Sequence, residues 1–237
     1  MWREVNWRAR LLLLLALATA CHGQTKEPKD QVNVNWLYGA YVPKDVPLAP
    51  LTGKQRFQLY LRQTYTTPGI YAKTVFFTIR DQSADSPPDW DRNAGGFVKR
   101  FASRQGQFII QNSLQALGNA AVGWEPRYER CRCDGFWLRT RHAAVRNFVT
   151  YARDEESLRP QLMPYAAAYG AGAIAARWQP NNPSPTIRGY QAAITQVFVG
   201  VGSNWLGEFM PDILNKLRRK KQKTAGSAQP AGSPDRP

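Results

Sequence analysis

The sequence predicts an all-α fold, a single helical domain of five or six helices over residues 51–217 packed partly through Gly/Ala-rich surfaces. Apolar side chains recur every three to four residues in several segments, which is the spacing of one helix face. An uncharged run of small residues, Leu158 to Trp178, suits close contact between helices. The length fits one core, because about 215 residues remain once a leader is removed.

The N-terminus has the pattern of a secretory signal over residues 1–20. Residues 1–10 carry three arginines, residues 11–20 read LLLLLALATA, and residues 18–20 match a small-x-small cleavage site. The apolar run is too short for a stable anchor, since spanning a bilayer takes roughly 20 residues. We therefore expect export to the periplasm or the cell envelope.

Cys21 directly follows this predicted cleavage site and has two interpretations. It resembles the lipidated cysteine of bacterial lipoproteins, although Ala18 stands where such motifs usually carry leucine. It is otherwise the first residue after a signal peptidase cut. Both alternatives stay open, and a lipid on Cys21 would attach the chain to the envelope.

The first part of the mature chain is expected to form an extended arm that is followed by a helix. Residues 21–50 are polar and punctuated by prolines, which predicts an extended arm or linker. A first helix follows, with Thr52 as its N-cap. Phe57, Tyr60 and Leu61 share one face of this helix and are its expected apolar side.

More helices are expected further along the chain. Residues 70–79 are too apolar for an uncovered surface and form either a buried helix or a strand. A helical stripe over about 25 residues starts near Phe97. Residues 136–151 have the pattern of an amphipathic helix with a basic outer face. The last long helix is expected over 189–217, with an interruption or restart at Pro211.

The Gly/Ala run from Leu158 to Trp178 has three interpretations. A nucleotide loop would need a preceding strand and an acidic residue about twenty positions later, and the run has neither. The run is nearly long enough for a membrane span, but alanine and glycine contribute little free energy of transfer into lipid. Residues 189–206 are the expected partner of a close helix contact. The predicted packing seam consists of small residues at four-residue spacing: Ala166, Gly170, Gly172 and Ala176.

The net charge of +15 favours polyanionic partners. The export signal argues against nucleic acid and leaves an anionic membrane surface or an acidic glycan. Residues 218–237 are expected to form a basic, disordered tail. The predicted anion contacts are six basic residues around the start of this tail: Lys216, Arg218, Arg219, Lys220, Lys221 and Lys223.

No pattern predicts a cofactor or a metal ion, and we expect neither. Cys131 and Cys133 form a lone C-x-C, whereas a closed zinc site needs four ligands. These two thiols are bridged to each other, paired between molecules, or free. His142 is expected at the surface or at the boundary of the core and not as a catalytic base. Four carboxylates are candidates for acid-base chemistry or for salt bridges to arginine: Glu125, Glu129, Glu208 and Asp212.

Short motifs in the second half of the chain read E-P-R-Y, F-W-L-R and E-F-M-P-D, with the Gly/Ala run between them. Together they resemble a family of uncharacterised exported acidobacterial proteins, which tend to carry D-P-R-Y, F-W-x-R and E-F-W-P-D. Glu125 replaces the aspartate of the first motif, and Met210 the tryptophan of the last. The resemblance implies only export and a domain over about residues 51–217. The residues that match the motifs are Pro126, Arg127, Tyr128, Trp137, Arg139, Glu208, Phe209, Pro211 and Asp212.

We therefore expect an exported, non-catalytic protein of the cell envelope that contacts anionic lipid or glycan through a basic surface and tail. Two alternatives stay open. An integral membrane helical protein would need the Gly/Ala run and residues 189–207 to insert into lipid. An enzyme acting on envelope polymers would need the four candidate carboxylates to converge in one cleft.

Overall fold

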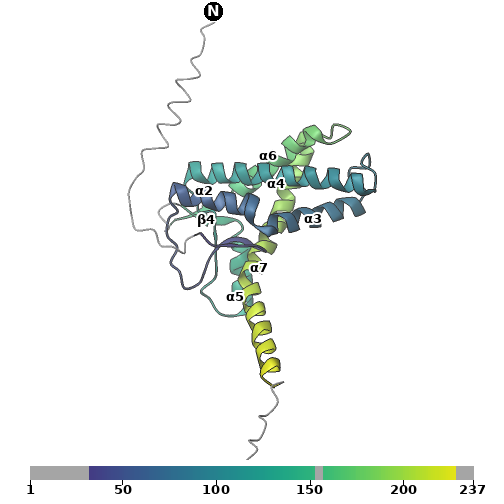
Figure 1. Ribbon diagram of the computed structural model, residues 1–237. Helices are drawn as coiled ribbons and strands as arrows, with labels where there is room; N and C mark the ends of the chain where they lie inside the picture. The colour runs from purple at the N-terminus through teal and green to yellow at the C-terminus, as the bar shows by residue number, and fades with distance from the viewer. Residues whose placement is uncertain (1–31, 153–156, 228–237) are drawn as a thin grey trace, which may run out of the picture. The chain divides into compact units, whose positions relative to one another are not determined.

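The computed structural model describes residues 32–152 and 157–227 (Figure 1). The predicted leader, Cys21 and the tail beyond residue 227 lie outside these ranges. The described residues contain six helices and two small sheets. The prediction of a mostly helical fold is confirmed, and the prediction of a purely all-α fold is wrong. The helices are α2 (Gly53–Leu61), α3 (Pro68–Ser83), α4 (Ala94–Val122), α5 (Phe136–Val145), α6 (Met163–Ala175) and α7 (Pro185–Ser227).

One sheet begins in the segment that we expected to be an extended arm. β1 (Val34–Asn35) pairs antiparallel with β2 (Gly39–Val42), and β2 pairs parallel with β3 (Tyr128–Glu129). The prediction of an extended arm is therefore wrong for residues 34–42, which lie in this sheet and the turn within it. These strands are held because Ala40 of β2 packs with Leu51 and Leu59 in a small apolar core.

The second sheet is an antiparallel pair, β4 (Val149–Tyr151) and β5 (Leu158–Pro160). It shortens the helical segment predicted over residues 136–151, because α5 ends at Val145. α6 begins at Met163, directly after this sheet. Proline at position 164 lies in the first turn of α6, where its missing N–H would be unpaired in any case.

Local caps mark the start of α2 and the end of α4. Thr52 and Gln55 form the capping box of α2, as the sequence predicts for Thr52. The π-helical turn Arg62–Thr66 follows α2 and leads into α3. The ambiguous residues 70–79 lie in α3, where Ile70 and Phe77 pack on Phe108 of α4. α4 ends at Val122, and its C-cap Gly123 has a φ of 75°, which suits glycine.

α6 and α7 make the close contact that the small residues predict. A Cβ added to Gly172 would lie 2.6 Å from the backbone oxygen of Arg188 and 2.7 Å from the Cβ of Ala192. Gly170 instead faces Leu114 of α4, at 3.1 Å from the same construction. Ala176 is buried, but Ala166 is exposed. The prediction for Ala166 is therefore wrong, because the buried face of α6 is formed by other small residues: Ala167, Ala168, Ala171, Gly172 and Ala175.

Replacing Gly172 with alanine is expected to lower the free energy of unfolding by about 1–3 kcal/mol. The added methyl group meets backbone of α7, which must shift as a unit. Gly202→Ala is the matched control, since no atom lies within 4 Å of its added Cβ and alanine favours a helix by about 0.5–1 kcal/mol. Urea denaturation measures both, and equal effects of the two substitutions would contradict the close contact.

α7 continues through Pro211 as far as Ser227. The predicted interruption at Pro211 is wrong, and so is the disordered tail over residues 218–227. Contacts with α5 on both sides of the proline keep the helix in line: the ring of Phe209 lies 5.3 Å from that of Phe136, and Asp212 pairs with Arg139 at 2.7 Å. Among the described residues, no helix combines the length and the apolar character needed to cross a membrane.

Candidate functional site

The C-terminal part of α7 carries the predicted anion contacts that the structure describes. Every residue from Ile213 to Arg219 is exposed. In Figure 1 no other described element lies beside the last turns of α7. We refer to this segment as the α7 end, defined by Ile213, Leu214, Lys216, Leu217, Arg218 and Arg219.

The α7 end is amphipathic and its apolar side is open to solvent. Ile213 and Leu217 are 44% and 54% exposed and lie one turn apart on the same side of the helix. Lys216 and Arg218 are the chain neighbours of Leu217, so they flank it on either side. Their long aliphatic stems can lie along an apolar surface while the charged groups stay in water.

The backbone positions of the other three predicted contacts, Lys220, Lys221 and Lys223, also lie on α7. Their side chains lie outside the described part of the structure. Because the helix continues past them, the six basic residues lie along one helix instead of in the disordered tail that the sequence predicts.

Aromatic residues of α5 lie beside the base of the α7 end. The Phe136 ring lies 5.3 Å from both the Phe209 ring of α7 and the Trp137 ring. Trp137 is 79% exposed, and its neighbour Leu138 is exposed as well. Tryptophan is enriched at membrane-water interfaces, because its body is apolar and its N–H is polar. The apolar side of the α7 end therefore extends onto α5.

Glu208 anchors α7 to the rest of the protein. Its side chain is completely buried. Its carboxylate accepts hydrogen bonds from the Tyr128 hydroxyl and the Cys131 backbone N–H, each at 3.0 Å, and from Arg139 Nε at 2.8 Å. The segment between α4 and α5 supplies two of these three donors and α5 supplies the third. The buried negative charge of Glu208 is therefore fully hydrogen-bonded.

Two arginines complete this anchor. The backbone oxygen of Glu208 accepts hydrogen bonds from Arg130 Nη2 at 3.1 Å and from Arg139 Nη2. Arg139 also pairs with Asp212 at 2.7 Å and lies 4.5 Å from the centre of the Phe209 ring. Burial alone would lower the pKa of Arg139, but Glu208 and Asp212 raise it above its ordinary value. Arg139 therefore stays a cation.

Tyr128 has a strongly raised pKa, first because of burial and then because of the charge of Glu208. Its hydroxyl therefore stays protonated and donates to the carboxylate. We refer to these residues as the Glu208 cluster: Tyr128, Arg130, Arg139, Glu208 and Asp212.

The residues of the three motifs do not all meet in the Glu208 cluster. Tyr128, Arg139, Glu208 and Asp212 belong to it, and Phe209 packs against it. The remaining four motif residues are not members of the cluster: Pro126, Arg127, Trp137 and Pro211. The sequence did not single out Arg130 or the Cys131 N–H as partners of Glu208, and no signal in the spacing could have found them, since both act through contacts distant along the chain.

The four candidate carboxylates are each paired with arginine, as the salt-bridge interpretation expects. Glu208 and Asp212 share Arg139, Glu125 pairs with Arg127 at 2.6 Å, and Glu129 lies 4.0 Å from Arg132. Arg127 also donates to the backbone oxygen of Ala49. These pairings stabilise the connector between α4 and α5 and leave the carboxylates engaged.

Cys131 and Cys133 are bridged to each other, which selects one of the three interpretations of this pair. His142 is half-buried, with Nε2 2.9 Å from the backbone oxygen of Glu129. Over the described ranges, no three His, Cys, Asp or Glu side chains are grouped so that they could hold a metal ion. Comparison of the chain with protein-family models, curated proteins and solved structures finds no match.

Proposed function

We propose that this protein binds the surface of an anionic membrane peripherally, through the α7 end. The observation that carries the proposal is the continuous helix at residues 213–219, whose apolar and basic side chains are all exposed. A helix with an apolar side flanked by lysine and arginine typically lies in the plane of the interface. Membrane lipid is favoured over glycan, because Ile213 and Leu217 gain nothing from a purely polar polyanion.

The expected energetics are those of weak, salt-sensitive attachment. Each lysine or arginine close to an anionic surface contributes about 1 kcal/mol, and burial of apolar side chains adds to this. Six basic residues follow Asp212 before the chain reaches residue 224. Trp137, which borders the same apolar side, would enter the headgroup region with them.

The compartment belongs to the same proposal. The pattern of residues 1–20 supports export, so the membrane would be one that faces the periplasm or the cell envelope. Lipidation of Cys21 would supply a second attachment, and two weak signals together hold a protein at a membrane far more stably than one. The likeness of the motifs to exported acidobacterial proteins supports the same compartment.

Cosedimentation with lipid vesicles tests the proposal. We expect binding to vesicles containing phosphatidylglycerol, and little binding to pure phosphatidylcholine, because the neutral surface attracts no cations. Binding should fall as the salt concentration rises between roughly 0.05 and 0.5 M, since the Debye length shortens.

Free polygalacturonate provides the glycan arm of this experiment. Binding to the polysaccharide without binding to the anionic vesicles would assign the basic residues to an acidic glycan instead. Equal binding to anionic and neutral vesicles at every salt concentration would contradict the proposal.

A further inference from the structure

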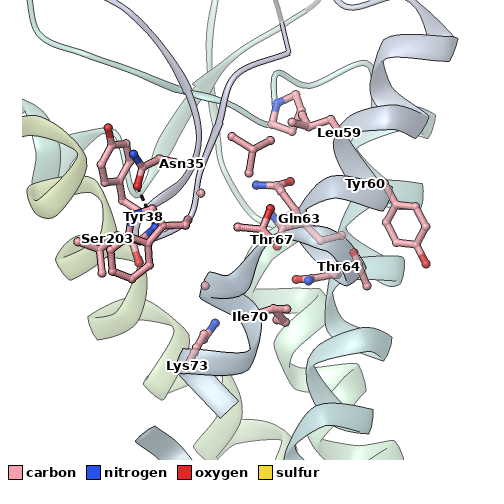
Figure 2. A pocket seen from close by; sticks show the side chains of 18 of the residues that line it. Asn35, Tyr38, Leu59, Tyr60, Gln63, Thr64, Thr67, Ile70, Lys73 and Ser203 are labelled. Atoms are coloured by element: carbon pink, nitrogen blue, oxygen red, sulfur yellow. Dashed lines mark hydrogen bonds between the residues drawn. The ribbon is translucent and has the colours of Figure 1, made fainter. Parts of the chain in front are cut away.

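A cavity of about 510 Å³ lies between the β1–β2 turn, the start of α3, and the facing sides of α4 and α7 (Figure 2). Sites for small molecules typically enclose roughly 300–1,000 Å³. Apolar side chains form much of the wall, among them Ile70, Phe76 and Leu206. No aspartate or glutamate is among the residues that line it.

Lys73 supplies a positive charge to this cavity without a negative partner. Figure 2 shows its side chain pointing from α3 into the space below the β1–β2 turn. No carboxylate of the described residues lies within 4.0 Å of its amine, which instead lies 4.4 Å from the centre of the Phe108 ring. Burial lowers the pKa of Lys73 to about 8.

The other cation in the wall is already engaged. Arg56 Nη1 donates a hydrogen bond to the backbone oxygen of Trp124 at 2.8 Å. Arg56 therefore helps to hold α2 against the end of α4, and Lys73 is the cation that faces the cavity without a protein anion beside it.

We propose that this cavity binds a small organic carboxylate with an apolar body. The carboxylate pairs with the Lys73 amine, and the apolar body lies against Ile70, Phe76 and Leu206. The pairing is charge-assisted and partly shielded from water, which makes it stronger than a neutral hydrogen bond. No aspartate or glutamate lines the cavity, so no negative charge in its wall repels an anionic ligand.

A pair of probes that differ only in charge tests this inference. Isothermal titration calorimetry compares 2-naphthylacetate with the neutral 2-naphthylacetamide on the full chain. We expect the carboxylate to bind at least about tenfold more tightly, because only the anion pairs with Lys73. Lys73→Met keeps the aliphatic stem and should abolish this preference, whereas Lys73→Arg should retain much of it.

Lys54→Met is the matched control, since it removes one exposed lysine that does not line the cavity. It should leave the preference unchanged. Lys73→Met should also keep or raise the midpoint of urea denaturation, because the lysine has no protein anion to lose, and this shows that the variant is folded. Absent binding of 2-naphthylacetate, equal binding of both probes, or a preference that survives Lys73→Met would each overturn the proposal.

Discussion

Replacing Glu208 with glutamine is expected to lower the free energy of unfolding by about 3–5 kcal/mol, the usual cost of removing one partner of a buried ion pair. The carboxylate is completely buried and accepts from Tyr128, from the Cys131 N–H and from Arg139. Glutamine has one acceptor oxygen and places an N–H₂ donor against donors at the other position. Urea denaturation measures the loss.

Asp212→Asn is the matched control for this substitution. Asp212 also pairs with Arg139, but its side chain is 47% exposed, so water replaces much of what the pairing provides. We expect a loss of no more than about 1 kcal/mol, as is typical of exposed ion pairs. If Glu208→Gln were as mild as Asp212→Asn, the Glu208 cluster would not be the anchor of α7.

Replacing all six basic residues after Asp212 with glutamine is expected to weaken binding to phosphatidylglycerol vesicles by about 10⁴-fold. This follows from about 1 kcal/mol for each cation near an anionic surface and about 1.4 kcal/mol for each tenfold change. Glutamine favours helices nearly as well as lysine and arginine, so α7 should persist. Circular dichroism checks this. The residues replaced are Lys216, Arg218, Arg219, Lys220, Lys221 and Lys223.

A control variant removes the same charge from other places on the surface. If net charge alone drives binding, the two variants should lose affinity equally. If the α7 end is the contact, the control should lose much less, because its cations lie away from the membrane. The exposed residues replaced in the control are Lys54, Arg62, Arg80, Lys99, Arg159 and Arg177.

Helices were predictable here because their signals are local. The capping box at Thr52 and the periodic apolar residues after Phe97 act within a few positions of the chain. The sheet was not predictable in this way, because β2 pairs with β3 through Tyr41 and Tyr128. No local sequence pattern indicates a strand partner so distant along the chain.

Periodicity located helix faces less well than helix positions. Phe57 has the spacing of a buried position in α2 but is exposed, and the adjacent face with Leu59 meets the core. Likewise, four-residue spacing of small residues defines two adjacent faces of α6, and only the neighbouring helices decide that Gly172 is buried and Ala166 is not. The neighbours are set by the tertiary fold.

The candidate site likewise combines features that were evident in the sequence with features that depend on the tertiary fold. The basic composition of residues 216–223 was evident in the sequence, but the helix that presents them depends on Glu208, whose donors come from a connector far away in the chain. Ile213 and Leu217 continue the apolar face of Phe209, so periodicity alone would bury them. Their exposure follows from where the rest of the described structure ends.

The most direct measurement of the membrane contact is the slope of log Kd against log salt concentration on phosphatidylglycerol vesicles, for the wild-type chain and for the two six-residue variants. The slope reports how many cations approach the anionic surface, because salt screens each of them. We predict a steep slope for the wild type and the control variant, and a nearly flat one for the variant at the α7 end. Equal slopes for all three proteins would contradict binding through the α7 end.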